Sequence, residues 1–296
     1  MKHRAILHPL GHPVEIRTNC EAVLDAARMS FDSWPSYFCS APARFEIEVH
    51  DGAAPAQPPR FEGPPGRFRL WYDDANSGQF DFAERTGRVR VAAKLVPDPQ
   101  FRHDFFVPLV LTALDSIFFT PLHAACVARD GRGVLLCGDS GAGKSTLSYA
   151  LARRGWTFLS DDVVHLAPGR QRIGVSGSAL IHLREPSREL FSEVRGVPLG
   201  TAPNRKLAIE IDAARQGFRT AHHAIVEKCF FLKRRPGPAN IRPFDVETAL
   251  EILLRALVPR DTTAIEPRLR EFLSSPPLAL EYENVDDAIA LLEDAA

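Results

Sequence analysis

A glycine-rich octapeptide in the middle of the chain limits the possible folds more than any other feature. Residues 138–145 read Gly-Asp-Ser-Gly-Ala-Gly-Lys-Ser and match the pattern G-x-x-x-x-G-K-[ST] at every fixed position. An apolar run at residues 133–137 precedes the octapeptide, as in a buried strand, and residues 145–154 have the pattern of a helix. This context favours a phosphate-binding loop in an α/β domain over the alternative, an ordinary glycine-rich turn.

The chemistry of a triphosphate explains these residue types. Glycines let the backbone curl so that successive N–H groups face the phosphate oxygens, and the positive end of the following helix adds to the attraction. We therefore expect ATP and Mg²⁺ here, with Lys144 reaching the β- and γ-phosphates and the Ser145 hydroxyl coordinating the metal. The expected nucleotide-binding residues are Gly138, Asp139, Ser140, Gly141, Ala142, Gly143, Lys144, Ser145 and Thr146.

Two adjacent acids, Asp161 and Asp162, follow the predicted helix at the end of an apolar segment. In phosphate-loop proteins an acid at the end of a neighbouring strand holds Mg²⁺. Adjacent side chains of an extended chain point to opposite faces, so one carboxylate can serve the metal while the other takes the proton of an acceptor hydroxyl. A turn or a solvated strand end is the alternative interpretation of this pair.

The first part of the chain has a different pattern and predicts a small α+β domain, residues 1–97. Strand-like alternation occurs at residues 14–18, 44–50, 68–72, 79–82 and 87–91, helical spacing at 21–34, and a proline-rich surface loop at 52–66. The last three of these strands suggest an antiparallel meander. No cluster of chemically active residues is evident there, so we expect a scaffold or a docking role.

The second domain is expected to cover residues 98–296 and to begin with a buried helix at 98–120. Strands are predicted at 122–128, 133–137, 156–166, 174–183, 206–211, 224–233 and 278–282, and helices at 145–154, 186–194, 246–257, 266–274 and 285–294.

Composition excludes several classes of protein. The 296 residues carry a formal net charge of −1, which argues against nucleic acid or an anionic membrane as the main partner. The five cysteines are scattered and never spaced as a CxxC pair, which argues against a disulfide framework and a zinc site. The apolar stretches are too short for a signal peptide or a membrane span. We therefore expect a soluble, cytoplasmic protein.

Four features in order resemble the catalytic domain of the HPr kinase/phosphorylase family. They are His123, the loop at residues 138–145, the pair Arg154-Gly155 and the pair Asp161-Asp162. The resemblance is strong over residues 122–164. It implies a kinase domain related to HPr kinase and, more distantly, to phosphoenolpyruvate carboxykinase, with a mixed sheet and helices, and transfer of the ATP γ-phosphate to a serine hydroxyl of a protein or peptide.

The resemblance also implies roles for individual residues. Asp161 is the expected base and belongs to a catalytic set with His123 and Lys144. Asp162 is the expected metal or phosphate partner, so that the metal ligands are Ser145 and Asp162, and His123 orients or polarises one of the aspartates. Without the resemblance, a buried histidine satisfied by backbone groups is the simpler interpretation of His123. Members of the family form oligomers, which makes a homo-oligomer plausible.

The chain departs from the family pattern at several points. Ala124 stands where the family usually has glycine, and Thr146 where it usually has glutamate. The signature Glu-x-Arg-Gly of bifunctional members is reproduced at residues 193–196, but farther from the aspartates than expected, so coincidence and a shifted equivalent both stay open. These differences indicate a divergent member and leave open both HPr as the substrate and the phosphorylase reaction.

The roles of Arg205 and Lys206 stay open, and so do two other functions for the chain. Arg205 and Lys206 begin a predicted strand, where a cation can meet the transferring phosphate or simply lie at a solvated edge. The chain can also be a nucleotide-binding regulatory or scaffold module, or a kinase of a small-metabolite hydroxyl. A non-catalytic module has no need for Asp161, Asp162 and His123 together. A long groove beside the loop favours a peptide acceptor, and a closed pocket favours a metabolite.

Overall fold

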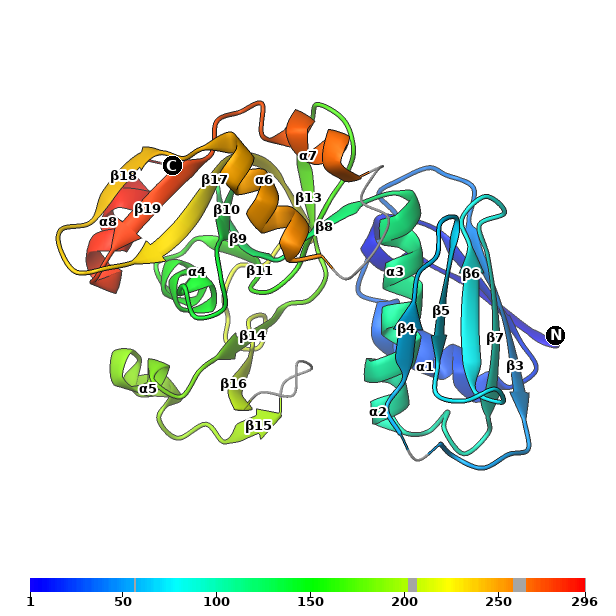
Figure 1. Ribbon diagram of the computed structural model, residues 1–296. Helices are drawn as coiled ribbons and strands as arrows, with labels where there is room; N and C mark the ends of the chain where they lie inside the picture. Colours follow the sequence, from blue (N-terminus) through cyan, green and yellow to red (C-terminus); the bar gives the residue numbers. More distant parts are fainter. Residues whose placement is uncertain (56, 202–206, 258–264, 296) are drawn as a thin grey trace. The chain divides into compact units, whose positions relative to one another are not determined.

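The computed structural model shows a mixed α/β protein and describes residues 1–296 except 56, 202–206, 258–264 and 296. The chain divides into two compact units, of which the first contains Met1–Phe119 and the second begins at Thr120 (Figure 1). No helix in the described part of the chain is long and apolar enough to cross a membrane.

The first unit is built on one seven-stranded sheet with the order β1-β2-β3-β7-β6-β5-β4. Its elements are β1 (His3–Leu7), β2 (Val14–Thr18), α1 (Glu21–Phe31), β3 (Ala43–His50), β4 (Arg60–Glu62), β5 (Arg67–Trp71), β6 (Ser77–Asp81), β7 (Thr86–Ala92), α2 (Pro99–Phe101) and α3 (Val107–Ile117). Strands β4 to β7 are antiparallel, while β2, β3 and β7 run parallel. Strand β1 was not expected, and β4 lies inside the segment expected to be a loop.

The helical segment before Thr120 belongs to the first unit, whereas the sequence placed it in the second domain. A π-helical turn, Arg102–Phe106, joins α2 to α3. The Phe105 ring stacks on Tyr72 at 5.3 Å between centroids, and Leu109 lies against Gly78 of β6. These apolar side chains are buried by the first sheet, and sequence periodicity shows only that a helix is apolar, not which sheet covers it.

The second unit contains the glycine-rich octapeptide, residues 138–145. Its elements are β8 (Thr120–Leu122), β9 (Ala124–Arg129), β10 (Arg132–Cys137), α4 (Lys144–Arg153), β11 (Thr157–Ser160), β12 (Val164–Leu166), β13 (Ile173–Ser176), β14 (Leu180–Leu183), α5 (Ser187–Leu190), β15 (Leu199–Thr201), β16 (Leu207–Asp212), β17 (His223–Arg234), β18 (Asn240–Pro243), α6 (Val246–Arg255), α7 (Ile265–Phe272), β19 (Leu278–Tyr282) and α8 (Val285–Ala295). A large mixed sheet has the order β11-β9-β10-β17-β13-β12-β8, with β19 on β17 and β18 on β19. A small sheet has the order β14-β16-β15.

Helices cover both faces of the large sheet. Val134 and Leu136 of β10 pack into a core shared with α4 and α8, while Leu135 and Cys137 pack into a second core with α6 and α7 (Figure 1). Successive residues of a strand point to opposite faces. A strand buried on both faces therefore has the continuous apolar run seen before the octapeptide.

Two predicted strands are each split in the structure. The segment expected at 156–166 forms β11 and β12, with Asp161 and Asp162 in the connection between them. The segment expected at 174–183 forms β13 and β14, which belong to different sheets. Strand β18 was not expected, and a 3-10 turn, Ser192–Val194, replaces the end of the helix expected at 186–194. Arg205 and Lys206 lie outside the described residues.

Candidate active site

The predicted phosphate loop, residues 138–145, connects β10 to α4 through three glycines in the left-handed region. The φ angles are 142° at Gly138, 91° at Gly141 and 101° at Gly143. Residues with a Cβ rarely adopt these angles, so glycine is needed at each turn of the loop. The loop ends directly in the first turn of α4.

Tyr282, the last residue of β19, contacts this loop through its hydroxyl group. Its hydroxyl donates a hydrogen bond to the Ala142 carbonyl at 2.7 Å, and a Cβ added at Gly143 would collide with the same hydroxyl oxygen. Burial raises the pKa of Tyr282 to about 12, so the hydroxyl keeps its proton to donate. Gly143 is therefore required by a close approach as well as by its φ angle. The sequence pattern contains no signal for this contact.

Lys144 begins α4 and is almost fully buried. Its ammonium donates hydrogen bonds to the Gly138 carbonyl at 2.8 Å and the Asp139 carbonyl at 3.3 Å. Burial lowers the pKa of Lys144, and the carboxylates of Asp161 and Asp162 oppose this shift. The paired aspartates therefore act electrostatically on the lysine of the loop.

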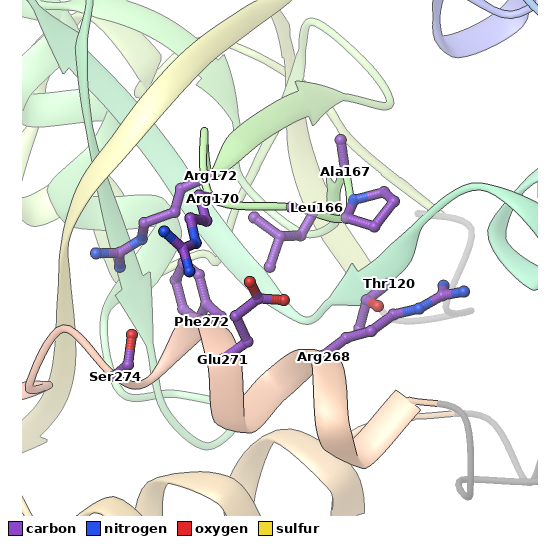
Figure 2. Close-up of a pocket in the computed structure, with 11 residues that line it drawn as sticks. Thr120, Leu166, Ala167, Arg170, Arg172, Arg268, Glu271, Phe272 and Ser274 are labelled. Atoms are coloured by element: carbon purple, nitrogen blue, oxygen red, sulfur yellow. The ribbon is translucent and has the colours of Figure 1, made fainter.

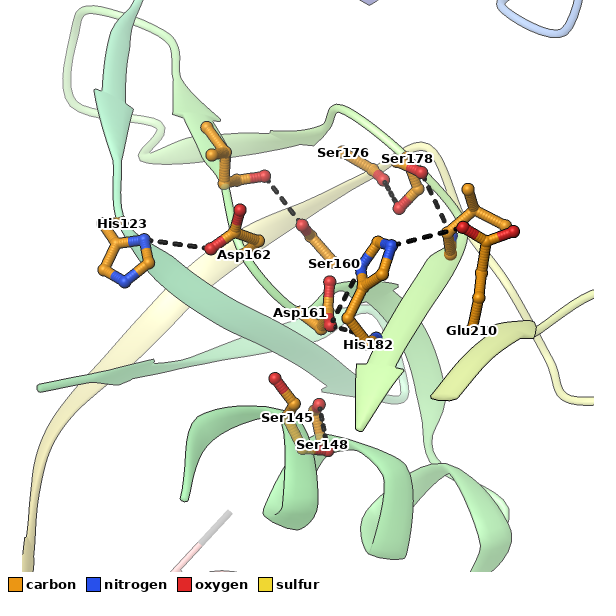
Figure 3. A network of polar contacts seen from close by, with 12 residues as sticks. His123, Ser145, Ser148, Ser160, Asp161, Asp162, Ser176, Ser178, His182 and Glu210 are labelled. Atoms are coloured by element: carbon orange, nitrogen blue, oxygen red, sulfur yellow. Dashed lines mark hydrogen bonds and ion pairs between the residues drawn. The ribbon is translucent and has the colours of Figure 1, made fainter. Parts of the chain in front are cut away.

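The register of three neighbouring strands explains why the aspartates lie close to Lys144. Cys137, just before the loop, pairs with Ala124, just after His123, and Ser160, just before the aspartates, pairs with Cys126. The ends of β10, β9 and β11 thus meet at one edge of the sheet. His123 also lines a cavity of about 110 Å³ together with Gly138. The structure brings His123, Ser145, Asp161 and Asp162 to this edge (Figure 3), and Lys144 precedes Ser145 in the first turn of α4.

The first of two histidine–aspartate pairs is partly exposed to solvent. His123 Nδ1 lies 3.1 Å from Asp162 Oδ1, and the two side chains are 36% and 55% exposed. The hydrogen bond from His123 lowers the pKa of Asp162. Asp162 is therefore an accessible carboxylate that stays ionised at neutral pH.

The second pair joins Asp161 to His182 and is buried. The backbone N–H of His182 donates to Asp161 Oδ2 at 2.6 Å, and the ring Nδ1 lies 3.7 Å from the same oxygen. The other ring nitrogen lies 3.5 Å from Glu210 Oε2. The contact with Asp161 raises the pKa of His182. In Figure 3, His182 and His123 face the two aspartates from opposite sides, with Ser145 at the start of the helix below.

His182 and Glu210 were not identified from the sequence as site residues. They are cross-strand partners on β14 and β16 of the small sheet, and their neighbours Ile181, Leu183 and Ile209 fill the core. Alternation in these strands predicts only that His182 lies on the face away from that core. Its position beside Asp161 depends on where the small sheet packs, which no local pattern contains.

The Glu-x-Arg-Gly segment at residues 193–196 is not brought to this edge. Glu193 Oε1 accepts a hydrogen bond from the Tyr149 hydroxyl at 3.1 Å and pairs with Arg153 Nε at 2.7 Å. Arg153 ends α4, whereas Lys144 begins it, so these ends are about 14 Å apart at 1.5 Å per residue. Arg195 Nε donates to the Arg188 carbonyl at 3.1 Å.

The described residues contain no group of three or more histidine, cysteine, aspartate or glutamate side chains that could hold a metal ion. Mg²⁺ in nucleotide sites usually takes one or two carboxylates together with phosphate oxygens and waters. One accessible carboxylate, Asp162, and the hydroxyl of Ser145 beside a phosphate loop fit that pattern of coordination.

The second unit contains segments that are similar to known proteins. Residues 119–199 match the family described as the HPr Serine kinase C-terminal domain. A putative HPr kinase/phosphorylase of Fusobacterium nucleatum is 32% identical over 120 residues, which cover 40% of this chain and 18% of that protein. An HPr kinase/phosphorylase of Limosilactobacillus reuteri is 39% identical over 66 residues, which cover 22% of this chain and 21% of that protein.

These matches span about a fifth of the length of the two curated relatives. Among solved structures, the HPr(Ser) kinase/phosphatase of Coxiella burnetii matches with a TM-score of 0.34 and 18% identity, covering 59% of this chain and 92% of that chain. Residues 119–199 are thus similar to the HPr Serine kinase C-terminal domain, which confirms the predicted resemblance.

Proposed function

We propose that the second unit is an ATP-dependent kinase that transfers the γ-phosphate to a serine-type hydroxyl of a protein or peptide. The observation that carries this proposal is the meeting, at one sheet edge, of a phosphate loop and two carboxylates that each have their own histidine. A site that only bound nucleotide would have no need for the second carboxylate. The match to the HPr serine kinase C-terminal domain supports the same reaction.

The donor half of the site consists of the loop from Gly138 to Thr146. The first N–H groups of α4 have no acceptor within the helix, so they are free to bind phosphate oxygens, and the helix dipole favours the negative charge. Lys144 exchanges its loop carbonyls for the β- and γ-phosphates. Ser145 and Asp162 would hold Mg²⁺, which would supply positive charge against these phosphates.

The acceptor half of the site centres on Asp161. Its Oδ2 atom receives both contacts from His182, so we assign proton transfer to Oδ1. The acceptor oxygen attacks the γ-phosphorus, the bond to the leaving ADP breaks, and Asp161 takes the hydroxyl proton. His182 holds the carboxylate in place, and His123 orients Asp162 towards the phosphates.

The names of the curated relatives suggest the protein HPr as one acceptor to test. The divergence of the chain keeps two alternatives, which are a small-metabolite hydroxyl and a regulatory NTPase without an acceptor. Since Glu193 and Arg195 are bound away from the aspartates, we assign them no part in the transfer.

Incubation with γ-labelled ATP and Mg²⁺, in separate reactions with HPr and with serine peptides, tests this function. We expect label on a serine of the acceptor. The label should be lost in Lys144→Ala and retained in Arg215→Gln, a control at an exposed arginine that pairs with Asp212. Label found only as free phosphate would contradict the kinase and favour the NTPase, and label in a small molecule would identify the metabolite alternative.

A further inference from the structure

The predicted phosphate loop carries an acidic side chain of its own. Asp139 follows Gly138 in the loop, and its side chain is 79% exposed. Its backbone carbonyl accepts hydrogen bonds from the Lys144 ammonium at 3.3 Å and from Ala142 N at 3.1 Å, which hold the chain at this point. An uncompensated carboxylate beside a bound polyphosphate repels it, because the two charges have the same sign. A cation that offsets Asp139 would therefore favour nucleotide binding.

Arg255, the last residue of α6, lies where such a cation is required. Its Nη2 atom is 2.9 Å from Asp139 Oδ1, and its side chain is 69% exposed. Solvent screens an exposed ion pair, so this pair contributes little to the stability of the fold. The main effect of the pair should therefore appear when an anion binds to the loop.

The packing of α6 brings Arg255 to the loop. Asp245 caps the helix, because its Oδ2 atom accepts a hydrogen bond from Thr248 N at 2.8 Å. Leu253 is buried in the same core as Cys137, the residue that precedes the loop. The last turn of α6 is thus held against the strand that leads into the loop, and Arg255 extends from this turn.

The carbonyl end of α6 is a second source of negative charge beside the loop. An α-helix carries about half a negative charge at its C-terminus, from carbonyl groups that have no partner within the helix. Residues from the end of α6 and the first three residues of the loop line one cavity of about 110 Å³. Arg255 is therefore placed to offset both its own helix end and the Asp139 carboxylate.

This cavity is part of the proposed nucleotide site. Sites for whole small molecules usually have volumes of about 300–1,000 Å³, so 110 Å³ is too small for a separate ligand. His123 lines the cavity together with Arg255 and Asp139. Burial lowers the pKa of Lys144, and the Asp139 carboxylate is among the groups that oppose this shift. Asp139 therefore acts on the same lysine that we expect to bind the phosphates.

A larger cavity in the same unit has a different arrangement of charges. It has a volume of about 450 Å³, lies beside α7 and shares no lining residue with the loop. There the Glu271 carboxylate lies between Arg170 and Arg268, and the Arg268 side chain turns outward (Figure 2). The charges of that cavity are spread apart, whereas Arg255 pairs directly with a residue of the loop.

We propose that Arg255 is a positioning residue for nucleotide binding and that it acts by neutralising Asp139. This inference rests on the proposed function, because it requires that the loop binds Mg·ATP. With Arg255 in place, the backbone N–H groups of the loop and Lys144 attract the phosphates without an opposing carboxylate. Without Arg255, Asp139 repels the phosphates, and the repulsion increases with the negative charge of the ligand.

Calorimetric titration of the full chain with Mg·ATP and with Mg·ADP tests this role. Arg255→Gln should raise the Kd of Mg·ATP by about two- to fivefold, the range that corresponds to an exposed ion pair. The Kd of Mg·ADP should rise less, because Mg·ADP carries less negative charge. The difference between Arg255→Gln and the wild type should shrink at about 1 M salt, where charges are screened beyond about 3 Å.

A double-mutant comparison separates neutralisation of Asp139 from a structural role of Arg255. When Asp139→Asn is added to Arg255→Gln, the double variant should bind Mg·ATP nearly as tightly as the wild type, because the opposing carboxylate is gone. Asp139→Asn alone should bind at least as tightly as the wild type. Arg215→Gln removes an exposed arginine that pairs with Asp212 and should leave the Kd unchanged.

The possible outcomes separate this inference from the proposed function. An unchanged Kd in Arg255→Gln, or a loss of affinity that Asp139→Asn does not restore, would overturn the role of Arg255. Equal losses for Mg·ATP and Mg·ADP would overturn the charge mechanism. A wild-type chain that binds no Mg·ATP would instead overturn the proposed function, and this inference with it.

Discussion

Two pairs of the same residue types, His123–Asp162 and His182–Asp161, lie on either side of the proposed reaction centre in different surroundings. The side chains of the first pair are 36% and 55% exposed, whereas those of the second are 20% and 5% exposed. Solvent screens an exposed ion pair, so its contribution to stability is small. A buried carboxylate that loses its partner keeps the full cost of desolvation.

The difference in exposure between the two pairs suggests that the two aspartates have different roles. Asp162 is accessible, in keeping with its proposed role as a metal ligand. Asp161 is fixed through Oδ2, which leaves Oδ1 for the proposed contact with an acceptor hydroxyl. The two aspartates are adjacent in sequence, yet the structure gives them different partners and different exposure. Their roles are therefore separable by experiment.

The largest expected effect separates the two carboxylates. Asp161→Asn should lower kcat by about 10²–10⁴, the usual contribution of a general base, with little change in the Kd of Mg·ATP. Asp162→Asn should instead raise the Mg²⁺ concentration required for half-maximal activity. Transfer rates and calorimetric Kd values measure both effects. A wild-type rate in Asp161→Asn would remove Asp161 from the mechanism, and interchanged phenotypes would exchange the two roles.

The next effect concerns stability. His182→Gln should lower the free energy of unfolding by about 1–2 kcal/mol, because the buried Asp161 loses a charge-assisted partner. His123→Gln should cost less than about 1 kcal/mol, as expected for an exposed pair. Urea unfolding followed by circular dichroism compares the two variants. Equal losses of unfolding free energy in the two variants would show that burial does not make one pair more stabilising than the other.

A smaller effect depends on pH and has opposite directions for the two pairs. The pKa of His182 is raised above 6.5, so its stabilisation is complete below pH 6.5 and is lost as pH rises through the raised value. The pKa of Asp162 is lowered below 3.8, so its stabilisation is present above pH 3.8 and is lost as pH falls through the lowered value.

Unfolding free energies measured across these two pH ranges test the predicted directions of the pH dependence. The difference between wild type and His182→Gln should shrink on the alkaline side, and the difference between wild type and Asp162→Asn should shrink on the acid side. A His182 difference that grows with rising pH would contradict the assigned contact with Asp161.

The smallest expected effect is at Glu210, which faces the outer nitrogen of His182 at 3.5 Å and is 58% exposed. Glu210→Gln should reduce kcat only a few-fold, because the solvent-exposed carboxylate is screened and acts through His182. It should also lower the pKa of His182, which NMR titration of the ring can follow. An unchanged pKa would show that Glu210 does not act on this histidine.

Much of the donor side was predictable because it depends on local sequence. The loop glycines, the strand before them and the helix after them lie within about twenty consecutive residues, and backbone conformation together with apolar patterning specifies them. The grouping of His123 with Asp161 and Asp162 was inferred through a family resemblance, and the strand register explains it physically. The roles of these residues stay proposals.

The boundary between the units and the split of two long strands were less predictable. An apolar helix fits either neighbouring sheet, and only packing against Tyr72 and Gly78 placed residues 99–117 in the first unit. The segment at 156–166 has apolar residues on both sides of the two aspartates, so its pattern did not show where the chain leaves the sheet at Asp161.

By itself, the sequence determined a glycine-rich loop between a buried strand and a helix, followed by two acids, because glycine conformation and apolar periodicity are local properties. Only the tertiary structure decided that Tyr282 braces the loop, that His182 from a separate sheet holds Asp161, and that Glu193 binds the far end of α4. Contacts between distant segments arise from the packing of whole elements, and the residues on either side of such a contact carry no local pattern that specifies it.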